Sequence, residues 1–378
     1  MSLQSLTITI TCDHIWFMLL ITEKMSVRYV ISAYIIIQIY YVISEAASVP
    51  PLYIFGDSLV DAGNNFYLTT VAKPNFPNGI DFGKPFGVPS GRFTNGRTVV
   101  DMIGQRIGLD TFMPPSRSPA ATGDAALKGL NYASAASGIL NETEWFLGFQ
   151  INLDAQISDF GKTRAEIISK VGQPQAGEFL NGGIFVIADG SNDLLFAPAL
   201  VDRDALIGAA ISRLRSQLIR LHGMDARKIV VTSSPPIGCL PFSRFIHSSQ
   251  ELCVSKPNLM AEEYNRRLKV LLSELTASCE GSRFVYADVY LMLDEILRNY
   301  ASYGFEVVGF GCCRVSLHGV TKLTPCGTLS SVCKDRSKFV FWDEFHLTER
   351  AYSFIAEKMM DGGLDYISPV NIRQLLMA

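Results

Sequence analysis

The chain has 378 residues, of which 48% are hydrophobic and 18% are charged, and this composition excludes a disordered chain and a coiled coil. Its length is sufficient for one large domain with a substantial buried core. The formal net charge of −3 gives no basic surplus, which argues against a nucleic-acid partner held through phosphate contacts.

The first 48 residues differ from the rest of the chain and have the layout of a secretory signal peptide. A basic residue precedes an apolar run over residues 29–43, and small residues follow that run. The run is shorter than the roughly 20 residues of a bilayer-spanning helix, so a signal peptide is favoured over the alternative, a transmembrane anchor. We expect Met25 to be the natural start, and residues 49–378 to form a single secreted domain without a stable membrane span.

Beyond residue 50, short apolar runs alternate with longer amphipathic segments, the pattern of an open parallel sheet covered by helices. Most strand candidates are continuously apolar, as expected where both faces of a strand are buried. The strand candidates are 52–55, 130–133, 184–188, 229–232, 284–287 and 339–342. The helix candidates are 153–171, 206–218 with Asp202 as its N-cap and Gly223 just past its end, 268–275 after Asn258, and 348–360.

Ligands bind at the carboxyl ends of the strands in such sheets, and four of these junctions carry polar residues. Gly56-Asp57-Ser58 follows the first strand candidate and can present a nucleophilic hydroxyl, although a helix-capping turn has similar residues. The G-x-S-x-G elbow is not matched, because Val60 occupies its last position. At the last junction, Asp343 precedes His346 by three residues and can orient it as a base; a capping aspartate beside an incidental histidine is the alternative.

The two middle junctions supply hydrogen-bond donors. A turn of small residues ends at Gly138, whose backbone can approach a ligand closely, and the segment 190–193 offers the Asn192 amide. A nucleophilic serine needs donors aimed at the developing oxyanion, and the N–H groups of Ser58 and Gly138 with Asn192 Nδ2 would form such a hole. Small-residue packing and an Asx turn are the simpler alternatives. The joint occurrence of these groups at successive strand ends favours a hydrolase site.

Seven of the eight cysteines lie beyond the leader, and six of these form two groups in the sequence. In an exported protein such groups predict local disulfides, with their connectivity left open. A zinc site of Cys312, Cys313, His318 and Cys326 is the alternative, although adjacent cysteines suit a tetrahedral site poorly. Cys279 is expected to be unpaired. The two groups are Cys239 with Cys253, and Cys312, Cys313, Cys326 and Cys333.

Taken together, these blocks resemble the GDSL-type esterase/lipase family of plants, within the SGNH hydrolase superfamily. The resemblance spans residues 50–362 and implies a three-layer α/β/α sandwich with a five-stranded parallel sheet. It also implies Ser58 as the nucleophile, Asp343 with His346 as the acid–base pair, and Ser58, Gly138 and Asn192 as the oxyanion donors. Besides the Gly138 turn, the matching blocks are GDSLVDAGNN (56–65), GRFTNGRTVVD (91–101), GSND (190–193), PPIGCLP (235–241) and FWDEFH (341–346).

The sequence departs from the family pattern at three positions. Leu347 stands where the family usually has proline, with a mild expected effect because Thr348 can still begin a helix. Arg314 stands where glycine usually follows the adjacent cysteines. Asp189 places an acid beside the oxyanion loop, where it would oppose oxyanion formation if its side chain pointed inward, so we expect it to point outward.

The sequence therefore predicts a secreted serine esterase or lipase that forms an acyl-enzyme on Ser58 and needs no metal or organic cofactor. An acyltransferase that uses the same residues and a catalytically silent secreted binding protein are the alternatives. The intact set of Ser58, Asn192, Asp343 and His346 argues against the silent protein.

The expected substrate is a small-molecule or lipid ester. Its acyl chain length depends on loops such as 66–90 and 112–124, whose composition does not identify it. Asn141, in the chain's single Asn-x-Ser/Thr sequon, is the predicted glycosylation site.

Overall fold

The computed structural model describes residues 49–83, 90–143, 148–198, 200–317, 320–322 and 326–377. Within this chain, Pro50–Ala378 forms one compact unit. The predicted leader, including the expected start at Met25, lies outside the described residues, as does His318 of the zinc alternative. No helix in the described ranges combines the length and the apolar character that a bilayer crossing requires.

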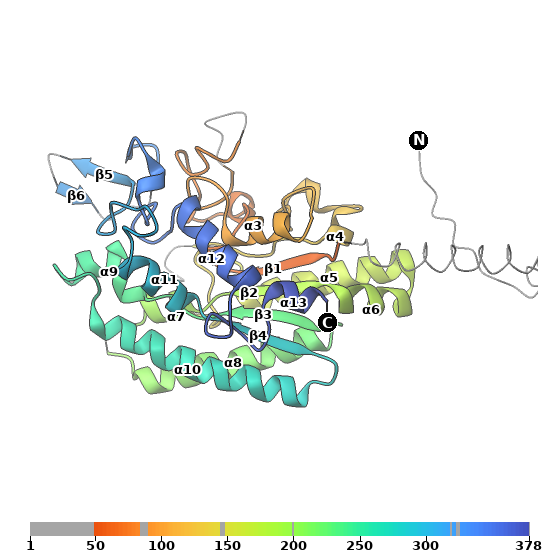
Figure 1. Cartoon of the computed structure of the whole chain (residues 1–378). Helices are drawn as coiled ribbons and strands as arrows, with labels where there is room; N and C mark the ends of the chain where they lie inside the picture. Colours follow the sequence, from red (N-terminus) through yellow and green to blue (C-terminus); the bar gives the residue numbers. More distant parts are fainter. Residues whose placement is uncertain are drawn as a thin grey trace, which may run out of the picture. The chain divides into compact units, whose positions relative to one another are not determined.

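A five-stranded sheet lies at the centre of this unit, in the order β1-β2-β3-β4-β8 (Figure 1). The first four strands pair in parallel and are almost completely buried, which explains their continuous apolar runs. The fifth, β8, pairs with β4 in the antiparallel direction, so the sheet is largely rather than entirely parallel. The strands are β1 (Leu52–Gly56), β2 (Ile184–Ala188), β3 (Lys228–Thr232), β4 (Arg283–Ala287) and β8 (Ile367–Ser368).

Two predicted strands, 130–133 and 339–342, are wrong. In the first segment, Asn131 forms isolated parallel bridges with Ile54 and Pro115 and no ladder. In the second, the isolated bridges are Phe339 with Val307 and Phe341 with Leu347. Both segments are buried in the core, where apolar residues are favoured in irregular chain as well as in strands. Burial, rather than a regular ladder, therefore produced the strand-like pattern.

Helices cover both faces of the sheet, and the predicted α/β/α fold class is confirmed (Figure 1). α12 packs with α3 on one side, and α8 packs with α5 and α10 on the other. The helices are α3 (Val99–Arg106), α4 (Ala125–Lys128), α5 (Leu153–Val171), α6 (Gln173–Gly182), α7 (Ser191–Leu195), α8 (Arg203–His222), α9 (Pro241–Ile246), α10 (Ser255–Ser278), α11 (Val289–Arg298), α12 (Glu349–Asp361) and α13 (Ile372–Leu376).

The four predicted helices are present as α5, α8, α10 and α12. Asp202 caps α8 by accepting hydrogen bonds from the N–H groups of Asp204 and Ala205, and Gly223 follows its last residue, as predicted. Thr348 caps α12, so the helix begins normally although Leu347 replaces the usual proline.

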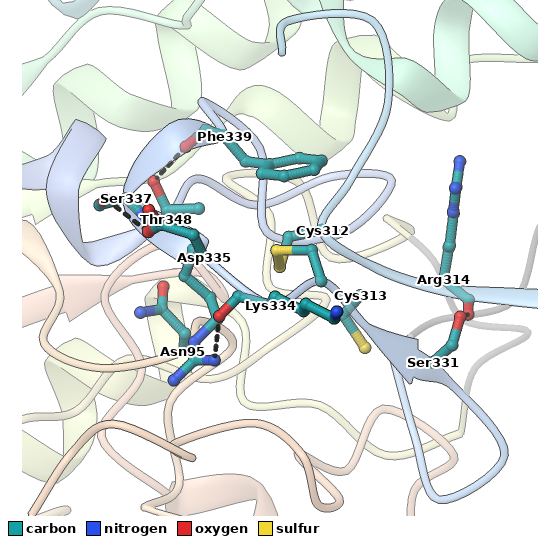
Figure 2. Close-up of a disulfide and its surroundings, with 12 residues drawn as sticks. Asn95, Cys312, Cys313, Arg314, Ser331, Lys334, Asp335, Ser337, Phe339 and Thr348 are labelled. Atoms are coloured by element: carbon teal, nitrogen blue, oxygen red, sulfur yellow. Dashed lines mark hydrogen bonds between the residues drawn. A yellow bond between two sulfur atoms is a disulfide. The ribbon is translucent and has the colours of Figure 1, made fainter. Parts of the chain in front are cut away.

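Three disulfides staple loops in the second half of the chain, which confirms the prediction of local pairing. They are Cys239–Cys253, Cys312–Cys333 and Cys313–Cys326. The pairing overturns the zinc alternative, because its three cysteines have no thiolate to offer a metal. Cys279 is unpaired and buried, as predicted. The four-cysteine group adjoins a small sheet of β5 (Cys313–Leu317), β6 (Val320–Lys322) and β7 (Ser331–Val332). Figure 2 shows Cys312 and Cys313 near Arg314 of β5 and Ser331 of β7.

Candidate active site

The predicted nucleophile stands on a tight turn directly after β1. Gly56 ends this strand with φ 147°, and a Cβ there would lie 2.1 Å from the Ala188 carbonyl oxygen, so the turn requires glycine. The Asp57 N–H donates to the same oxygen at 3.1 Å, which places the turn beside the end of β2. The buried Asp57 carboxylate accepts the Leu59 N–H at 2.9 Å. Ser58 is therefore presented, half-buried, by a turn that is fixed on both sides.

His346 lies between Ser58 and Asp343, although Ser58 is 288 positions away in the chain. Its Nε2 is 2.8 Å from Ser58 Oγ, and its Nδ1 is 2.8 and 3.0 Å from the two Asp343 oxygens. Because a carboxylate only accepts hydrogen bonds, Nδ1 carries the proton and Nε2 accepts the Ser58 hydroxyl. Asp343 is fixed in turn by the N–H groups of Phe345 and His346, both at 2.9 Å.

The turn that carries Asp343 and His346, here called the acid–base turn, is buried among apolar groups. Asp343 is 1% exposed and His346 6% exposed, and the Phe93 ring lies 5.4 Å from the imidazole. Between them in sequence, Glu344 is also buried, and burial together with the charge of Asp343 raises its pKa to about 7. The departure at Arg314 bears on this group, since the Arg314 charge acts to lower the same pKa.

The three predicted oxyanion donors lie on adjoining segments. The Ser134 N–H donates to the Gly56 carbonyl at 2.9 Å, which brings the loop that carries Gly138 beside the end of β1. Asn192, on α7, donates its Nδ2 to the Ser137 carbonyl at 2.8 Å, so its amide lies next to Gly138. Among the described residues, nothing accepts the N–H groups of Ser58 and Gly138. These two groups can therefore donate to a ligand.

The expected orientation of Asp189 is wrong. Its side chain is buried, and it accepts hydrogen bonds from the Ser137 hydroxyl and the Gly190 N–H, both at 2.8 Å. Burial, and then the charges of Asp57 and Asp193, raise the pKa of Asp189 well above its usual range. A raised pKa favours the neutral form of a carboxyl, which does not repel an oxyanion, so the inward position is compatible with the predicted chemistry.

Sequence reasoning missed Gln156 of α5, which is fully buried behind the nucleophile turn. Its side-chain oxygen accepts the Gly56 N–H at 2.8 Å, and its Nε2 donates to the Gly56 carbonyl and to Ser137 Oγ, both at 2.9 Å. The available signal was a polar residue on an apolar helical stripe, between Leu153 and Ile157. Gln156 thus joins the nucleophile turn to the oxyanion loop.

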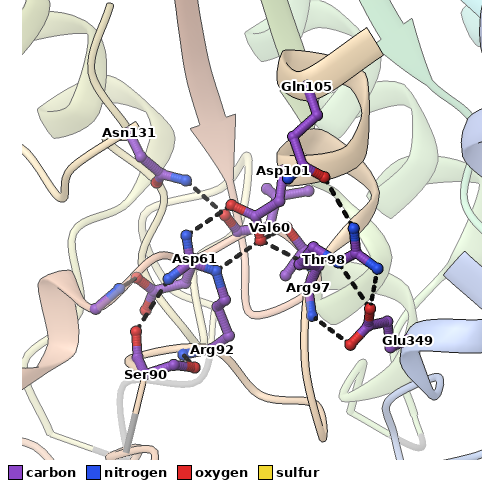
Figure 3. Close-up of polar contacts among 11 residues, drawn as sticks. Val60, Asp61, Ser90, Arg92, Arg97, Thr98, Asp101, Gln105, Asn131 and Glu349 are labelled. Carbon is purple, nitrogen blue, oxygen red and sulfur yellow. Dashed lines mark hydrogen bonds and ion pairs between the residues drawn. The ribbon is translucent and has the colours of Figure 1, made fainter. Parts of the chain in front are cut away.

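Residues of the 91–101 block form polar contacts with α3 and with the start of α12 (Figure 3). Arg92 forms a buried bidentate pair with Asp101 of α3, at 2.6 Å for each bond. Thr94 donates its hydroxyl to the Leu347 carbonyl at 2.8 Å, and Arg97 pairs with Glu349 at the start of α12. The block therefore connects α3 to the segment that directly follows the acid–base turn.

Buried carboxylates gather near the nucleophile without forming a metal centre. Asp57 and Asp61 are fully enclosed, and burial raises the pKa of each to about 7. Asp61 accepts the N–H groups of Gly63, Asn64 and Ala135. Across the parts of the chain that the structure describes, no cluster of three or more histidine, cysteine or acidic side chains is arranged to hold a metal ion.

Comparison with known proteins agrees with this geometry. The family model described as "GDSL-like Lipase/Acylhydrolase" matches residues 52–359. The chain is 47% identical over 340 residues to "GDSL esterase/lipase At4g16230" of Arabidopsis thaliana, covering 86% of this chain and 91% of that relative. It is 41% identical over 339 residues to "GDSL esterase/lipase At3g50400" of the same plant, covering 85% of this chain and 90% of the relative. "GDSL esterase/lipase 7", also of Arabidopsis, is 38% identical over 340 residues, covering 86% and 92%.

Proposed function

The chain belongs to the GDSL-like lipase/acylhydrolase family and is a carboxylic ester hydrolase; we propose that it is a secreted serine esterase that acts through an acyl-enzyme on Ser58. The observation that carries this proposal is the hydrogen-bonded chain from Ser58 Oγ through His346 to Asp343, with both links at 2.8 Å. A serine, a histidine and a buried carboxylate in this order form the arrangement that activates a serine hydroxyl.

In the acylation half-reaction, Ser58 Oγ attacks the ester carbonyl carbon while His346 Nε2 takes the hydroxyl proton. Asp343 holds the imidazole in the required tautomer and stabilises the imidazolium that forms. When the tetrahedral intermediate collapses, the bond to the alcohol oxygen breaks and His346 returns the proton to that oxygen. The alcohol leaves, and the acyl group remains on Ser58 as an ester.

In the deacylation half-reaction, a water molecule takes the place of the alcohol. His346 Nε2 accepts a proton from the water, the resulting hydroxide oxygen bonds to the acyl carbon, and the bond to Ser58 Oγ breaks. Ser58 recovers its proton from His346, and the carboxylic acid is released. In both half-reactions the negative carbonyl oxygen would be bound by the N–H groups of Ser58 and Gly138 and by Asn192 Nδ2.

The proposed nucleophile is tested by Ser58→Ala. We expect this variant to keep the melting temperature of the wild type and to lose nearly all hydrolysis of p-nitrophenyl acetate. A fluorophosphonate probe should label Ser58 in the wild type and nothing in the variant. Undiminished turnover by the folded variant would rule out an acyl-enzyme on Ser58.

The proposed oxyanion hole is tested by Asn192→Ala. The loss of one donor should cost about 2.7–4 kcal/mol of transition-state stabilisation, expressed as a lower kcat with little change in KM. An increase in KM at constant kcat would instead assign Asn192 to substrate binding.

Secretion is supported by the signal-peptide pattern of residues 1–48 and by the three disulfides, which persist in oxidising compartments. Expression in a secreting plant or insect host should release a protein whose first residue lies near Val49. Retention in the cell with an N-terminus at Met1 or Met25 would contradict secretion.

A further inference from the structure

Two segments that carry the predicted oxyanion donors, 137–140 and 189–193, are joined by several side-chain hydrogen bonds. From the segment 189–193, Asn192 contacts the Ser137 carbonyl at 2.8 Å, and Asp193 accepts the N–H groups of Ile139 and Leu140, both at 2.9 Å. Asp189 completes the set by accepting the Ser137 hydroxyl at 2.8 Å. Ser137 is therefore held by two residues of this segment, one at its carbonyl and one at its side chain.

The position of Ser137 determines two of the three proposed oxyanion donors. Its carbonyl and the Gly138 N–H belong to the same planar peptide unit, so they cannot turn independently. The carbonyl also receives one of the two Nδ2 protons of Asn192, and this bond orients the other proton. A rotation of the Ser137–Gly138 peptide would therefore displace the Gly138 N–H and the Asn192 amide together.

The Ser137 side chain connects this peptide unit to other parts of the protein through hydrogen bonds. Its fully buried hydroxyl accepts from Gln156 Nε2 at 2.9 Å and donates to Asp189 Oδ2. Gln156 approaches from α5, and Asp189 approaches from the end of β2. The two contacts come from different layers of the fold, and removal of either leaves the hydroxyl half-satisfied in a buried position.

From this geometry we propose that Asp189 is a positioning residue for ester hydrolysis: through Ser137 it fixes the peptide that aims the Gly138 N–H and the Asn192 amide at the oxyanion. The proposal rests on the proposed function, since it assumes that these groups bind the oxyanion. It explains why an acid can occupy this position in a working site. The carboxyl is used as a hydrogen-bond acceptor for the Ser137 hydroxyl and the Gly190 N–H.

The test compares kcat and KM for p-nitrophenyl acetate among Asp189→Ala, Asp189→Asn, Ser137→Ala and the double variant Asp189→Ala/Ser137→Ala. A misaimed donor costs less than the 10²–10³-fold of a deleted one, so we expect each alanine variant to lose about tenfold in kcat at unchanged KM. The double variant should be no worse than either single variant, because both act on one contact. Asp189→Asn keeps the shape of the side chain and one acceptor oxygen, which can still receive the Ser137 hydroxyl, so it should retain most of the activity.

A matched control separates positioning from general destabilisation. Thr163, also on α5 and buried, bonds to the Tyr132 hydroxyl at 2.8 Å and lies outside the oxyanion network. Thr163→Val should lower the melting temperature and leave kcat unchanged. Wild-type kcat in Ser137→Ala or Asp189→Ala would overturn the proposal, as would strictly multiplicative losses in the double variant.

The outcomes also distinguish this proposal from the function on which it rests. If Ser58→Ala remains active, the proposed function fails whatever the Asp189 variants do. If Ser58→Ala is inactive while the Asp189 and Ser137 variants turn over normally, only the positioning role fails. Should Asp189→Ala not fold, the comparison of Ser137→Ala with Asp189→Asn still decides the question, because the proposal requires a tenfold loss in the first and a small loss in the second.

Discussion

The two halves of the candidate site are held in place by different physical means. In the serine half, residues 57–65 lie against residues 131–143 through buried side-chain amides. Asn64, which has no exposed surface, donates its Nδ2 to the carbonyls of Asn131 and Ala133, both at 2.8 Å, and accepts the Arg117 N–H at 3.0 Å. None of the three disulfides of the described chain includes a residue of this half.

The acid–base half, which carries Asp343 and His346, adjoins the four-cysteine group of Cys312, Cys313, Cys326 and Cys333. The N–H groups of Cys312 and Cys313 donate to the carbonyls of Phe341 and Trp342, at 3.0 and 2.6 Å, directly before Asp343. The fully buried Trp342 ring packs in a small core with Cys312, Cys313 and Cys326, separate from the main core of the domain. Two disulfides thus stiffen the chain that carries Asp343 and His346.

The difference follows from what surrounds each half. The serine half lies against the main core, where a broken hydrogen bond leaves a buried polar group and is costly, so side-chain amides suffice to fix the loops. The acid–base half borders a small core of its own, which buries little apolar surface. Disulfide cross-links can supply there the stability that apolar burial does not. Reduction should therefore weaken the acid–base half selectively.

The largest expected effect is the removal of the cross-links beside Asp343. In the variant with Cys312, Cys313, Cys326 and Cys333 all changed to Ala, we expect the free energy of unfolding to fall by at least about 3 kcal/mol, the value for one loop of about 15 residues. Urea denaturation of the wild type and the variant measures this loss. An unchanged midpoint would mean that the disulfides do not stabilise this half.

A reductant provides the control for that experiment. Dithiothreitol should lower the stability of the wild type toward that of the four-cysteine variant. Among the disulfides of the described residues, only Cys239–Cys253 remains in the variant for dithiothreitol to reduce, so a much smaller shift is expected. Equal shifts in both proteins would place the reductant sensitivity outside the acid–base half.

A smaller loss is expected when the polar scaffold of the serine half is broken. Asn64→Ala would leave the Ala133 carbonyl buried without its donor, at a cost of about 1–3 kcal/mol for an unsatisfied group, whereas the Asn131 carbonyl would still accept the Ser116 N–H. This loss of stability relative to the wild type should be the same with and without dithiothreitol. The loss in the four-cysteine variant, in contrast, should become much smaller when dithiothreitol is present. A matched surface variant, Asn299→Ala at the exposed end of α11, should change stability by less than about 0.5 kcal/mol.

A pH-dependent effect should distinguish the acid–base half further. The pKa of Glu344, raised to about 7 by burial and by the Asp343 charge, exceeds the value of about 4.3 in an unfolded chain. The folded state therefore holds a proton that the unfolded state releases between these values, and stability falls as pH rises from about 4 to 7. Glu344→Gln, which cannot ionise, should match the wild type near pH 4 and melt a few degrees higher above pH 7.

The exposed Glu357 of α12 supplies the comparison. Glu357→Gln should not change the pH dependence of the melting temperature. If Glu344→Gln shows no gain above pH 7, the carboxyl of Glu344 is solvated or paired in the folded protein, and the acid–base half is more open than its burial indicates.

Much of this arrangement was predictable because its signals are local. The parallel strands at 52–56 and 184–188 are continuous apolar runs, and Ser58, Asp343 and His346 follow strand-like segments in recognisable blocks. The roles of these residues came from the resemblance to a family, since Gly-Asp-Ser and Asp-x-x-His each have a simpler explanation. The site could be assembled from the sequence only because the blocks occur together.

The remainder depends on contacts between distant segments. The inward position of Asp189 requires the Ser137 hydroxyl as a partner, 52 positions away, and neither residue signals the other in the sequence. The same holds for the pairing of Cys312 with Cys333 rather than with Cys326, and for β8, whose two residues are too few for a periodic pattern. The strand predicted at 339–342 is wrong for a different reason. Burial selects apolar residues in irregular chain as well as in strands, so an apolar run alone does not identify a strand.

The smallest expected effect concerns the predicted glycan, and it also measures how the serine half is held. Asn141 is exposed, and its contact with Asn152 at 3.0 Å uses Oδ1, which leaves Nδ2 to carry a sugar. In a secreting eukaryotic host, the wild type should show a mass shift that a glycosidase removes. Asn141→Gln should lose that shift and keep kcat within about twofold of the wild type, as for a surface change.

Thr143 sharpens this test, because it belongs to the sequon and also donates its hydroxyl to Asp193 at 2.6 Å, beside the Gly138 loop. Thr143→Ser preserves both functions and should behave as the wild type, whereas Thr143→Val loses the glycan and the hydrogen bond together. Any decrease in kcat of Thr143→Val below that of Asn141→Gln then measures the hydroxyl alone. Equal kcat values would show that the loop is held without Thr143, and an unglycosylated wild type would remove the glycan prediction while leaving the hydroxyl comparison intact.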